Sequence, residues 1–118
     1  MQRVRVVNSS RGLVLAEDAE LADNLWSRFW GLMGRASLAP GGGLVLRPGG
    51  GIHTFFMRLP LDVLHVDRRG RVTHVVRGIK PWRLGPQWVG GALAVELPAG
   101  AAGASQPGDE VVVEELSG

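Results

Sequence analysis

Short apolar segments separated by turn-forming residues constrain this chain more than any other feature of its sequence. Each segment is shorter than a typical helix, and most are bounded by Gly, Pro, Asn or Asp. Helical segments do not alternate with them, so the pattern predicts a mainly β fold, a compact antiparallel sandwich or partly open barrel. The expected strands cover residues 4–7, 13–15, 44–46, 61–66, 72–76, 92–97 and 111–116.

Two of the intervening stretches have the composition of hairpin turns. "NSSRG" (residues 8–12) separates the first two expected strands, and "DRRG" (residues 67–70) separates the fourth and fifth. The segment 99–108, "AGAAGASQPG", carries little that can pack and is expected to be a loop or a short turn.

One segment departs from the β pattern. Between about Asn24 and Met33, apolar residues recur with helical spacing. Asp23 is suited to the N-cap, and Gly34 to the left-handed position that ends a helix. We therefore expect one short N-terminal amphipathic helix that covers an end of the fold.

A chain of 118 residues is expected to form one domain, residues 1–118. It contains no cysteine, which excludes disulfides, thiolate metal sites and cysteine nucleophiles. The first residues, "MQRVRVV", lack an apolar run of signal length, and no apolar stretch reaches the roughly 20 residues that span a bilayer. A soluble, cytoplasmic protein without a membrane span is expected.

The net charge of +2 conceals an uneven distribution along the chain. Residues 1–46 carry +1, residues 47–83 carry +6 and residues 84–118 carry −5. A basic middle segment attracts anionic partners, but its arginines are expected to pair with acids of the C-terminal strand. No recognition helix or aromatic ladder accompanies it, so we expect no specific nucleic acid partner.

The stretch "GGGIHTFFMRLPLDVLHVD", residues 49–67, combines core-forming residues with chemically active ones. In an extended chain Asp62 shares a face with Leu64, and an unpaired buried carboxylate costs several kcal/mol. Asp62 is therefore expected to be hydrogen-bonded or to lie at the end of its strand. A chain reversal at Pro60 would bring it near His53 or Arg58.

The three histidines, His53, His65 and His74, lack the spacing of a metal site, and no cysteine assists them. We expect no metal and no cofactor. His65 and His74 lie nearly opposite each other across the hairpin expected at 67–70, where they are predicted to stack on a solvent-exposed face.

Several motifs together resemble domain-of-unknown-function family 192 over about residues 26–113. They are "WSRFWGLMGR", "GIHTFFMRLPLDVLHVDRRGRV", "KPWR", "VELPAG" and the "GD" before the last strand. The resemblance implies a compact, mainly β domain with a helix near its start, and it implies no activity because none is assigned to the family. Many relatives carry a cysteine where this chain has Gly50, so this chain could not perform a chemistry that needs that thiol.

The characteristic polar positions of the family carry over to eight residues of this chain. Relatives usually carry an aromatic at position 65, so His65 is interpreted as a local substitution. The eight residues are His53, Thr54, Arg58, Asp62, Asp67, Trp82, Arg83 and Glu96.

Our first hypothesis is a small binding module with a polar cleft for a small anionic or polar ligand, or a peptide. An arginine would bind a carboxylate or phosphate, and a tryptophan would supply a flat apolar wall. The candidate site residues are His53, Thr54, Arg58, Asp62, Trp82 and Arg83.

Two alternatives stay open. In a hydrolase-type enzyme, His53 would act as the base and Asp62 would orient it. In a purely structural or interaction domain, His53, Asp62 and Glu96 would bond backbone groups at strand ends, and a partner could pair with an exposed edge strand. A monomer or weak dimer is expected in either case.

Overall fold

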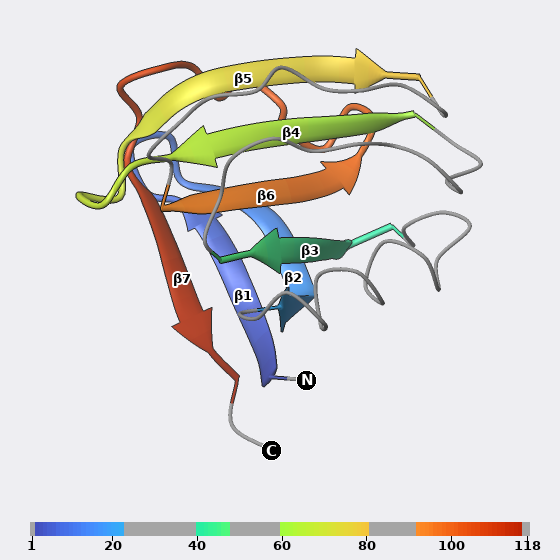
Figure 1. Cartoon of the computed structure of the whole chain (residues 1–118), viewed down its shortest axis with the longest axis vertical. Coiled ribbons are helices and arrows are strands. Elements are labelled where there is room, and N and C mark those ends of the chain that lie inside the picture. Colours follow the sequence, from blue (N-terminus) through green and yellow to red (C-terminus); the bar gives the residue numbers. More distant parts are fainter. Residues whose placement is uncertain (1, 23–39, 48–59, 81–91, 117–118) are drawn as a thin grey trace.

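The computed structural model of the protein describes residues 2–22, 40–47, 60–80 and 92–116. Within these ranges, seven strands form one sheet in the order β5-β4-β6-β3-β2-β1-β7 (Figure 1). The strands are β1 (Gln2–Asn8), β2 (Leu13–Ala22), β3 (Gly42–Leu46), β4 (Leu61–Val66), β5 (Val72–Ile79), β6 (Leu93–Pro98) and β7 (Val111–Glu115).

All seven predicted strands are confirmed, and β2 is the one whose length differs most from the prediction. It continues from residue 16 to residue 22 through a stretch rich in Ala, Glu and Asp, which have low strand propensity. Pairing with β1 on one side and β3 on the other overrides that propensity. The helix expected at residues 24–33 lies outside the described residues. The described ranges contain no helix, and therefore none that could cross a membrane.

The pairing of β2 with β3 is the one parallel ladder among the described strands. The other ladders are antiparallel, as predicted. A parallel neighbour requires a long crossover connection, which residues 23–41 provide.

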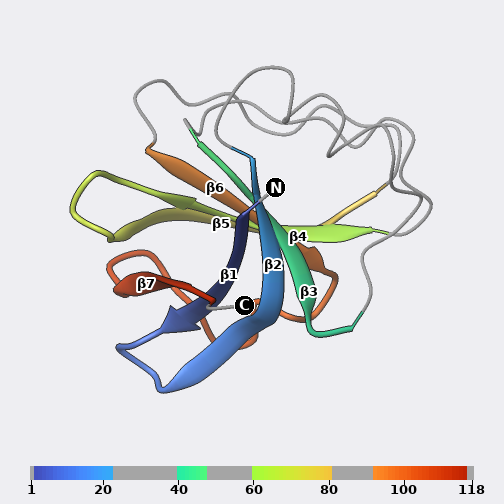
Figure 2. The same ribbon diagram turned by 90° about the horizontal axis from the view of Figure 1, so that it is seen from below.

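The sheet curls until its two outer strands, β5 and β7, meet at one corner. Arg71 and Glu110 form an isolated bridge there, and the Val111 amide donates to the Gly70 carbonyl oxygen at 2.8 Å. Beyond this corner β7 runs at a steep angle to β5, so the two edges separate (Figures 1 and 2). The expected partly open barrel is confirmed, and its closure is limited to one end.

A buried polar network holds the closed corner. Asp109 Oδ2 accepts hydrogen bonds from Arg11 Nε at 2.6 Å and from Asn8 Nδ2 at 2.9 Å. The Gln106 amide donates to the same oxygen at 2.9 Å, and Asn8 Nδ2 also donates to Ser105 Oγ. These bonds tie the β1–β2 turn to the segment that leads into β7.

Successive side chains of a strand point to opposite faces of the sheet, and apolar side chains are buried on both of these faces. Along β4, Leu64 and Val66 belong to a cluster inside the curl, whereas Leu61 and Val63 belong to a second cluster on the opposite face. The first cluster joins side chains of β1, β2 and β7 to those of β4, β5 and β6. All six residues of β4 are buried as a result.

Two glycines at the start of β3 are needed for different reasons, one for its backbone conformation and one for its lack of a side chain. Gly41 has a φ of 77°, a left-handed conformation that favours glycine. At Gly43, a Cβ would lie 3.1 Å from the Glu96 carbonyl oxygen and 3.1 Å from Leu97 Cδ2. The absence of a side chain there lets β3 and β6 pack closely.

The expectation that middle-segment arginines pair with acids of the C-terminal strand is wrong for Arg71 and Arg77. Their guanidinium groups donate to backbone carbonyl oxygens, Arg71 to Gly108 and Arg77 to Gly103 and Ser105. The ion pairs among the described residues join Arg3 to Asp18 and Glu20, Arg5 to Glu17, and Arg11 to Asp109. The reason is topological, since β1 separates β7 from β2 and β5 contacts β7 only at the corner.

We predict that Asp109→Asn reduces the loss of stability in acid. The Arg11 guanidinium, assisted by Asn8 and the Gln106 amide, lowers the pKa of Asp109 from 3.8 to about 2. Because the folded pKa lies below the unfolded one, the stabilisation is complete above about pH 4 and is lost as the pH falls through 2. Urea unfolding at several pH values between 2 and 5 should show a flatter profile for the variant.

The control for that measurement is Glu17→Gln, which changes an exposed carboxylate on β2. A profile for Asp109→Asn that runs parallel to the wild type would show that Asp109 does not stabilise the corner through its charge.

Candidate functional site

Of the six predicted site residues, Asp62 is the one that the structure describes. His53, Thr54, Arg58, Trp82 and Arg83 lie outside the described residues, so their convergence with Asp62 stays a prediction. The site is therefore built from Asp62 and the segments around it.

The Asp62 side chain is buried at the start of β4 and binds three backbone amides. Its residue is 2% exposed. Oδ1 accepts a hydrogen bond from the Gly78 amide at 2.9 Å. Oδ2 accepts from Gly100 at 2.9 Å and from Ala102 at 3.1 Å. One carboxylate thus joins β4 to β5 and to the segment that follows β6, as the expectation of a hydrogen-bonded Asp62 required.

A β-bulge on β5 directs the first of these amides toward Asp62. Leu61 pairs with Ile79 and Val63 with Val76, so two residues of β5, Arg77 and Gly78, lie opposite Asp62 alone. Gly78 has a φ of 66°, which favours glycine. The bulge turns the Gly78 amide inward and places the Arg77 side chain beside it.

Successive tight turns supply the other two amides. Amide-to-carbonyl hydrogen bonds run from Ala101 to Pro98, from Gly103 to Gly100 and from Ser105 to Ala102, at 3.0 to 3.1 Å. Gly100 and Gly103 have φ values of 92° and 58°. The turns leave the amides of residues 100 and 102 free of backbone partners among the described residues, and Asp62 accepts from both.

These segments enclose a cleft of about 310 Å³. Arg77 also lines the cleft, and its Nη2 donates to the carbonyl oxygens of Gly103 at 3.0 Å and Ser105 at 2.6 Å. Much of the remaining wall is glycine backbone, so little side-chain bulk restricts entry. The lining residues are Asp62, Arg77, Gly78, Ala99, Gly100 and Gly103.

The cleft retains hydrogen-bonding capacity after these internal bonds are made. A carboxylate has about four acceptor positions, and Asp62 uses three of them. Within the described part of the chain, Nε and Nη1 of Arg77 have no partner, and a guanidinium carries five N–H donors. The residues that line the cleft therefore retain donor groups on Arg77 and one acceptor position on Asp62.

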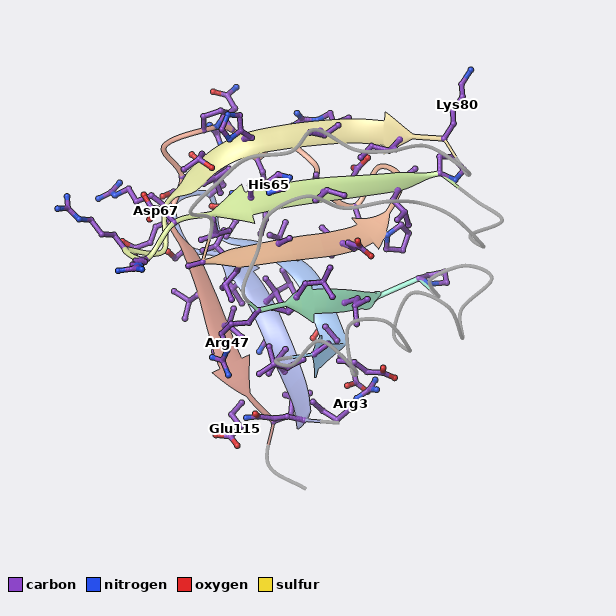
Figure 3. The ribbon with its side chains drawn as sticks, in the orientation of Figure 1. Arg3, Arg47, His65, Asp67, Lys80 and Glu115 are labelled. Atoms are coloured by element: carbon purple, nitrogen blue, oxygen red, sulfur yellow. The ribbon has the colours of Figure 1, made fainter. Side chains whose placement is uncertain are left out.

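Two further buried ionisable residues lie on the face of the sheet opposite to Asp62. His65 is 1% exposed and lies in the middle of β4 (Figure 3). Glu96 of β6 is 1% exposed on the same face. Val63 pairs with Glu96 and His65 with Ala94, so the two side chains are diagonal neighbours.

His65 pairs with His74 of β5, as predicted, but not on a solvent-exposed face. Their rings meet edge to face, with centroids 6.2 Å apart and planes at 88°. The prediction of a solvent-exposed face is wrong because β4 is an interior strand that is covered on both sides. Burial, with a smaller contribution from the charge of His74, lowers the pKa of His65 to about 4.

Asp67 stabilises the β4–β5 turn. Its Oδ1 accepts hydrogen bonds from the amides of Arg69 at 2.8 Å and Arg71 at 3.0 Å, and these lower its pKa, the Arg71 bond most. A hydrogen-bonded Asx turn of this kind accounts for an aspartate at this position without any ligand.

Arg77 and the turns after β6 were missed as site residues at the sequence level. The available signal was Gly78, since a glycine inside an otherwise regular strand indicates a bulge. The position of Arg77 beside Asp62 depends on strand register, which neither residue reveals alone. Among the described residues, no group of three or more His, Asp or Glu side chains is arranged to hold a metal ion.

Comparison with known sequences identifies a family. The profile of domain-of-unknown-function family 192 (DUF192), described as "Uncharacterized ACR", matches residues 6–113. A "UPF0127 protein" of Thermococcus sibiricus is 30% identical over 103 residues, which cover 80% of this chain. The same alignment covers 64% of the length of the Thermococcus protein.

Two crystal structures have a similar fold. One is a Sinorhizobium meliloti protein, described provisionally as a transcription regulator, with 26% identity and a TM-score of 0.74. That match covers 95% of this chain and 92% of the other. A Novosphingobium aromaticivorans protein of unknown function has 23% identity and a TM-score of 0.72, with coverage of 93% and 83%.

We predict that Asp62→Ala destabilises the fold by about 2–5 kcal/mol, because one buried and two partly buried amides lose their acceptor. A buried donor left without a partner costs about 1–3 kcal/mol, and a partly buried one costs less because water can reach it. Asp67→Ala is the matched control, since it also removes a carboxylate that accepts backbone amides, but at an exposed turn. Its cost should be about 1 kcal/mol or less. Equilibrium urea unfolding measures both, and equal losses would contradict a special role for Asp62.

We predict that His65→Leu removes a pH dependence of stability between about pH 6.5 and 4. The folded pKa of about 4 lies below the unfolded value of 6.5, so the unfolded chain binds the proton first as the pH falls. Stability contributed by the neutral imidazole is complete above pH 6.5 and declines toward pH 4, by up to about 3 kcal/mol at about 1.4 kcal/mol per pKa unit.

Thermal or urea unfolding over pH 4–7.5 compares His65→Leu with His74→Gln. The His74 variant should keep most of the pH dependence, because burial of His65 is the larger cause of the shift. A profile unchanged by His65→Leu would show that another group titrates.

Proposed function

Because the chain belongs to domain-of-unknown-function family 192, whose description names no activity, we propose its function from the geometry of the cleft. We propose that the protein is a small binding module, and that the cleft at Asp62 binds a small polar molecule that carries a carboxylate or phosphate. The observation that carries this proposal is the bulge opposite Asp62, which places Arg77 among the residues that line the cleft.

The size of the cleft selects the class of ligand. A volume of about 310 Å³ is at the lower end of the range of about 300–1,000 Å³ that small-molecule sites occupy. A metabolite of a few heavy atoms would fit such a space better than a long peptide would.

The donors and acceptors of the cleft determine which chemical groups a ligand needs. The Nε–H and Nη1–H groups of Arg77 lie on different sides of the guanidinium, and each can donate a separate charge-assisted hydrogen bond to a carboxylate or phosphate oxygen. The remaining acceptor position of Asp62 favours a ligand that also has a hydroxyl or amino group. A hydroxy acid, amino acid or sugar phosphate would satisfy both.

The other five predicted residues remain part of the proposal. If His53, Thr54, Arg58, Trp82 and Arg83 reach the same cleft, they would add two further cations and an apolar wall. Variants of these five residues in the titrations described below would test their part in binding.

The hydrolase alternative receives less support from the described residues. A carboxylate that orients a catalytic histidine needs an oxygen directed at the imidazole. Asp62 directs both oxygens at backbone amides, which favours a structural and positioning role. The provisional description of the Sinorhizobium protein as a transcription regulator concerns that protein, and no contact in this chain leads us to extend it.

We predict that Arg77→Gln weakens binding of small anions at least roughly tenfold, because a hydrogen bond to a charged group contributes about 1.5–3 kcal/mol. The probes are inorganic phosphate, malate, aspartate and glycerol 3-phosphate, with neutral glycerol for comparison. Amide chemical shifts of Gly78, Gly100 and Gly103 report whether each probe enters the cleft. Isothermal titration then measures affinity for the probe that causes the largest shifts.

Two variants control this experiment. Arg69→Gln removes the same charge from the exposed β4–β5 turn and should leave affinity within about twofold. Arg77→Lys keeps the charge but not the planar donor set of the guanidinium, so it should bind at intermediate strength. The proposal fails if no probe shifts the cleft amides, or if the Arg69 and Arg77 variants weaken binding equally.

A further inference from the structure

The outer edge of β7 is open beyond the closed corner. Successive residues of β7 direct their backbone groups alternately toward β1 and toward the outer side. The Ser9 and Leu116 amides form hydrogen bonds between the β1 and β7 segments, whereas the Val111 amide donates to Gly70 on the outer side. In an antiparallel ladder this alternation places the N–H and C=O groups of Val113 and Glu115 on the outer side with Val111. Within the described residues, no segment pairs with Val113 or Glu115 there.

The open edge adjoins an incompletely covered part of the core. Val113 of β7 and Val75 of β5 both pack against the cluster inside the curl, yet both remain only partly buried. They lie on the two strands that separate beyond the corner (Figure 1). A strand added along β7 would pair with Val113 and Glu115 and would cover part of this cluster with its inward side chains.

The exposed side chains of β7 beyond the corner include one apolar residue and two acidic ones. Val112 is 38% exposed, and both Glu114 and Glu115 are exposed. Arg5 lies opposite Glu114 across β1 but also contacts Glu17, with Nε 3.6 Å from Oε2. Glu115 projects at the free end of β7, far from Asp67 at the closed corner (Figure 3). The exposed carboxylates of Glu114 and Glu115 therefore give this edge a negative charge.

This charge disfavours a second copy of the chain as the added strand. An antiparallel pair of β7 strands that used both Val113 and Glu115 would place Glu114 directly opposite its own equivalent. Like charges directly opposite each other destabilise a sheet, whereas opposite charges stabilise it. The edge is matched to a strand whose side chains there are basic.

We propose that the outer edge of β7 binds an extended peptide segment in which apolar residues alternate with lysine or arginine, by addition of a strand to the sheet. The apolar side chains would lie on the face of the partly buried Val113 and Val75, and the basic side chains would lie on the opposite face beside Glu114. Glu115 is exposed at the free end of β7 and adds negative charge to the same edge. This surface shares no residue with the cleft at Asp62, so the two proposals stand independently.

The competing interpretation is that the acids only protect an exposed edge from pairing. Charged side chains are a common means of preventing edge-to-edge association. The two interpretations differ in one observable, namely whether a basic extended peptide binds the edge through its backbone.

Three nine-residue peptides with a fluorescent label distinguish the two interpretations of the edge. The first alternates Val and Lys, the second replaces every Lys with Glu, and the third repeats the first with N-methyl groups on alternate amides. We expect the Val–Lys peptide to bind at least tenfold more tightly than the Val–Glu peptide in fluorescence anisotropy. N-methylation should remove binding, because it blocks the ladder hydrogen bonds without changing the charge.

Charge reversal on the protein locates the site. The double variant Glu114→Lys, Glu115→Lys should weaken the Val–Lys peptide at least tenfold. The matched control, Glu17→Lys with Asp18→Lys, makes the same charge change on β2 and should weaken it less than threefold. Circular dichroism confirms that both variants are folded, and amide shifts at Val113 and Glu115 identify the edge in the wild type.

Several results would overturn the proposal. They are the absence of binding by the Val–Lys peptide, binding that survives N-methylation, and equal weakening by the two double variants. A wild-type protein that binds no peptide, together with a β7 variant that forms dimers, would show that the acids only protect the edge.

Discussion

The buried carboxylate of Asp62 is the interaction on which the rest of the described structure depends. It accepts amides from the β5 bulge and from the turns after β6, two segments that make no ladder with each other. Without this acceptor, the bulge and the turns would each leave amides without partners in partly buried surroundings. The same bonds define the cleft, because its lining residues are those that Asp62 brings together.

Two other aspartates also accept hydrogen bonds from backbone amides of irregular segments. Asp67 accepts two amides of the β4–β5 turn, and Asp109 accepts an amide, an arginine and an asparagine at the closed corner. In each case a carboxylate satisfies backbone donors that irregular chain cannot pair within the sheet. A small domain without disulfides thereby keeps its connecting segments in defined positions.

Incomplete closure of the curl gives the molecule two distinct surfaces. At Asp62, the bulge and the glycine-rich turns leave a cleft whose walls are mostly backbone. Along β7, separation from β5 beyond the corner leaves an edge whose ladder positions are open within the described residues. Full closure of the barrel would have removed the edge altogether.

The sequence by itself determined the family, the mainly β class, the position of every described strand and the need of Asp62 for hydrogen-bond partners, because periodicity and turn chemistry are local properties. It did not predict that β2 and β3 are parallel, that His65 is buried, or that Arg77 lies beside Asp62. Those features depend on strand order and on one extra residue in the register of β5 opposite Asp62. Tertiary structure decided them because contacts between residues distant in sequence depend on the packing of the whole sheet. The local sequence pattern does not determine those contacts.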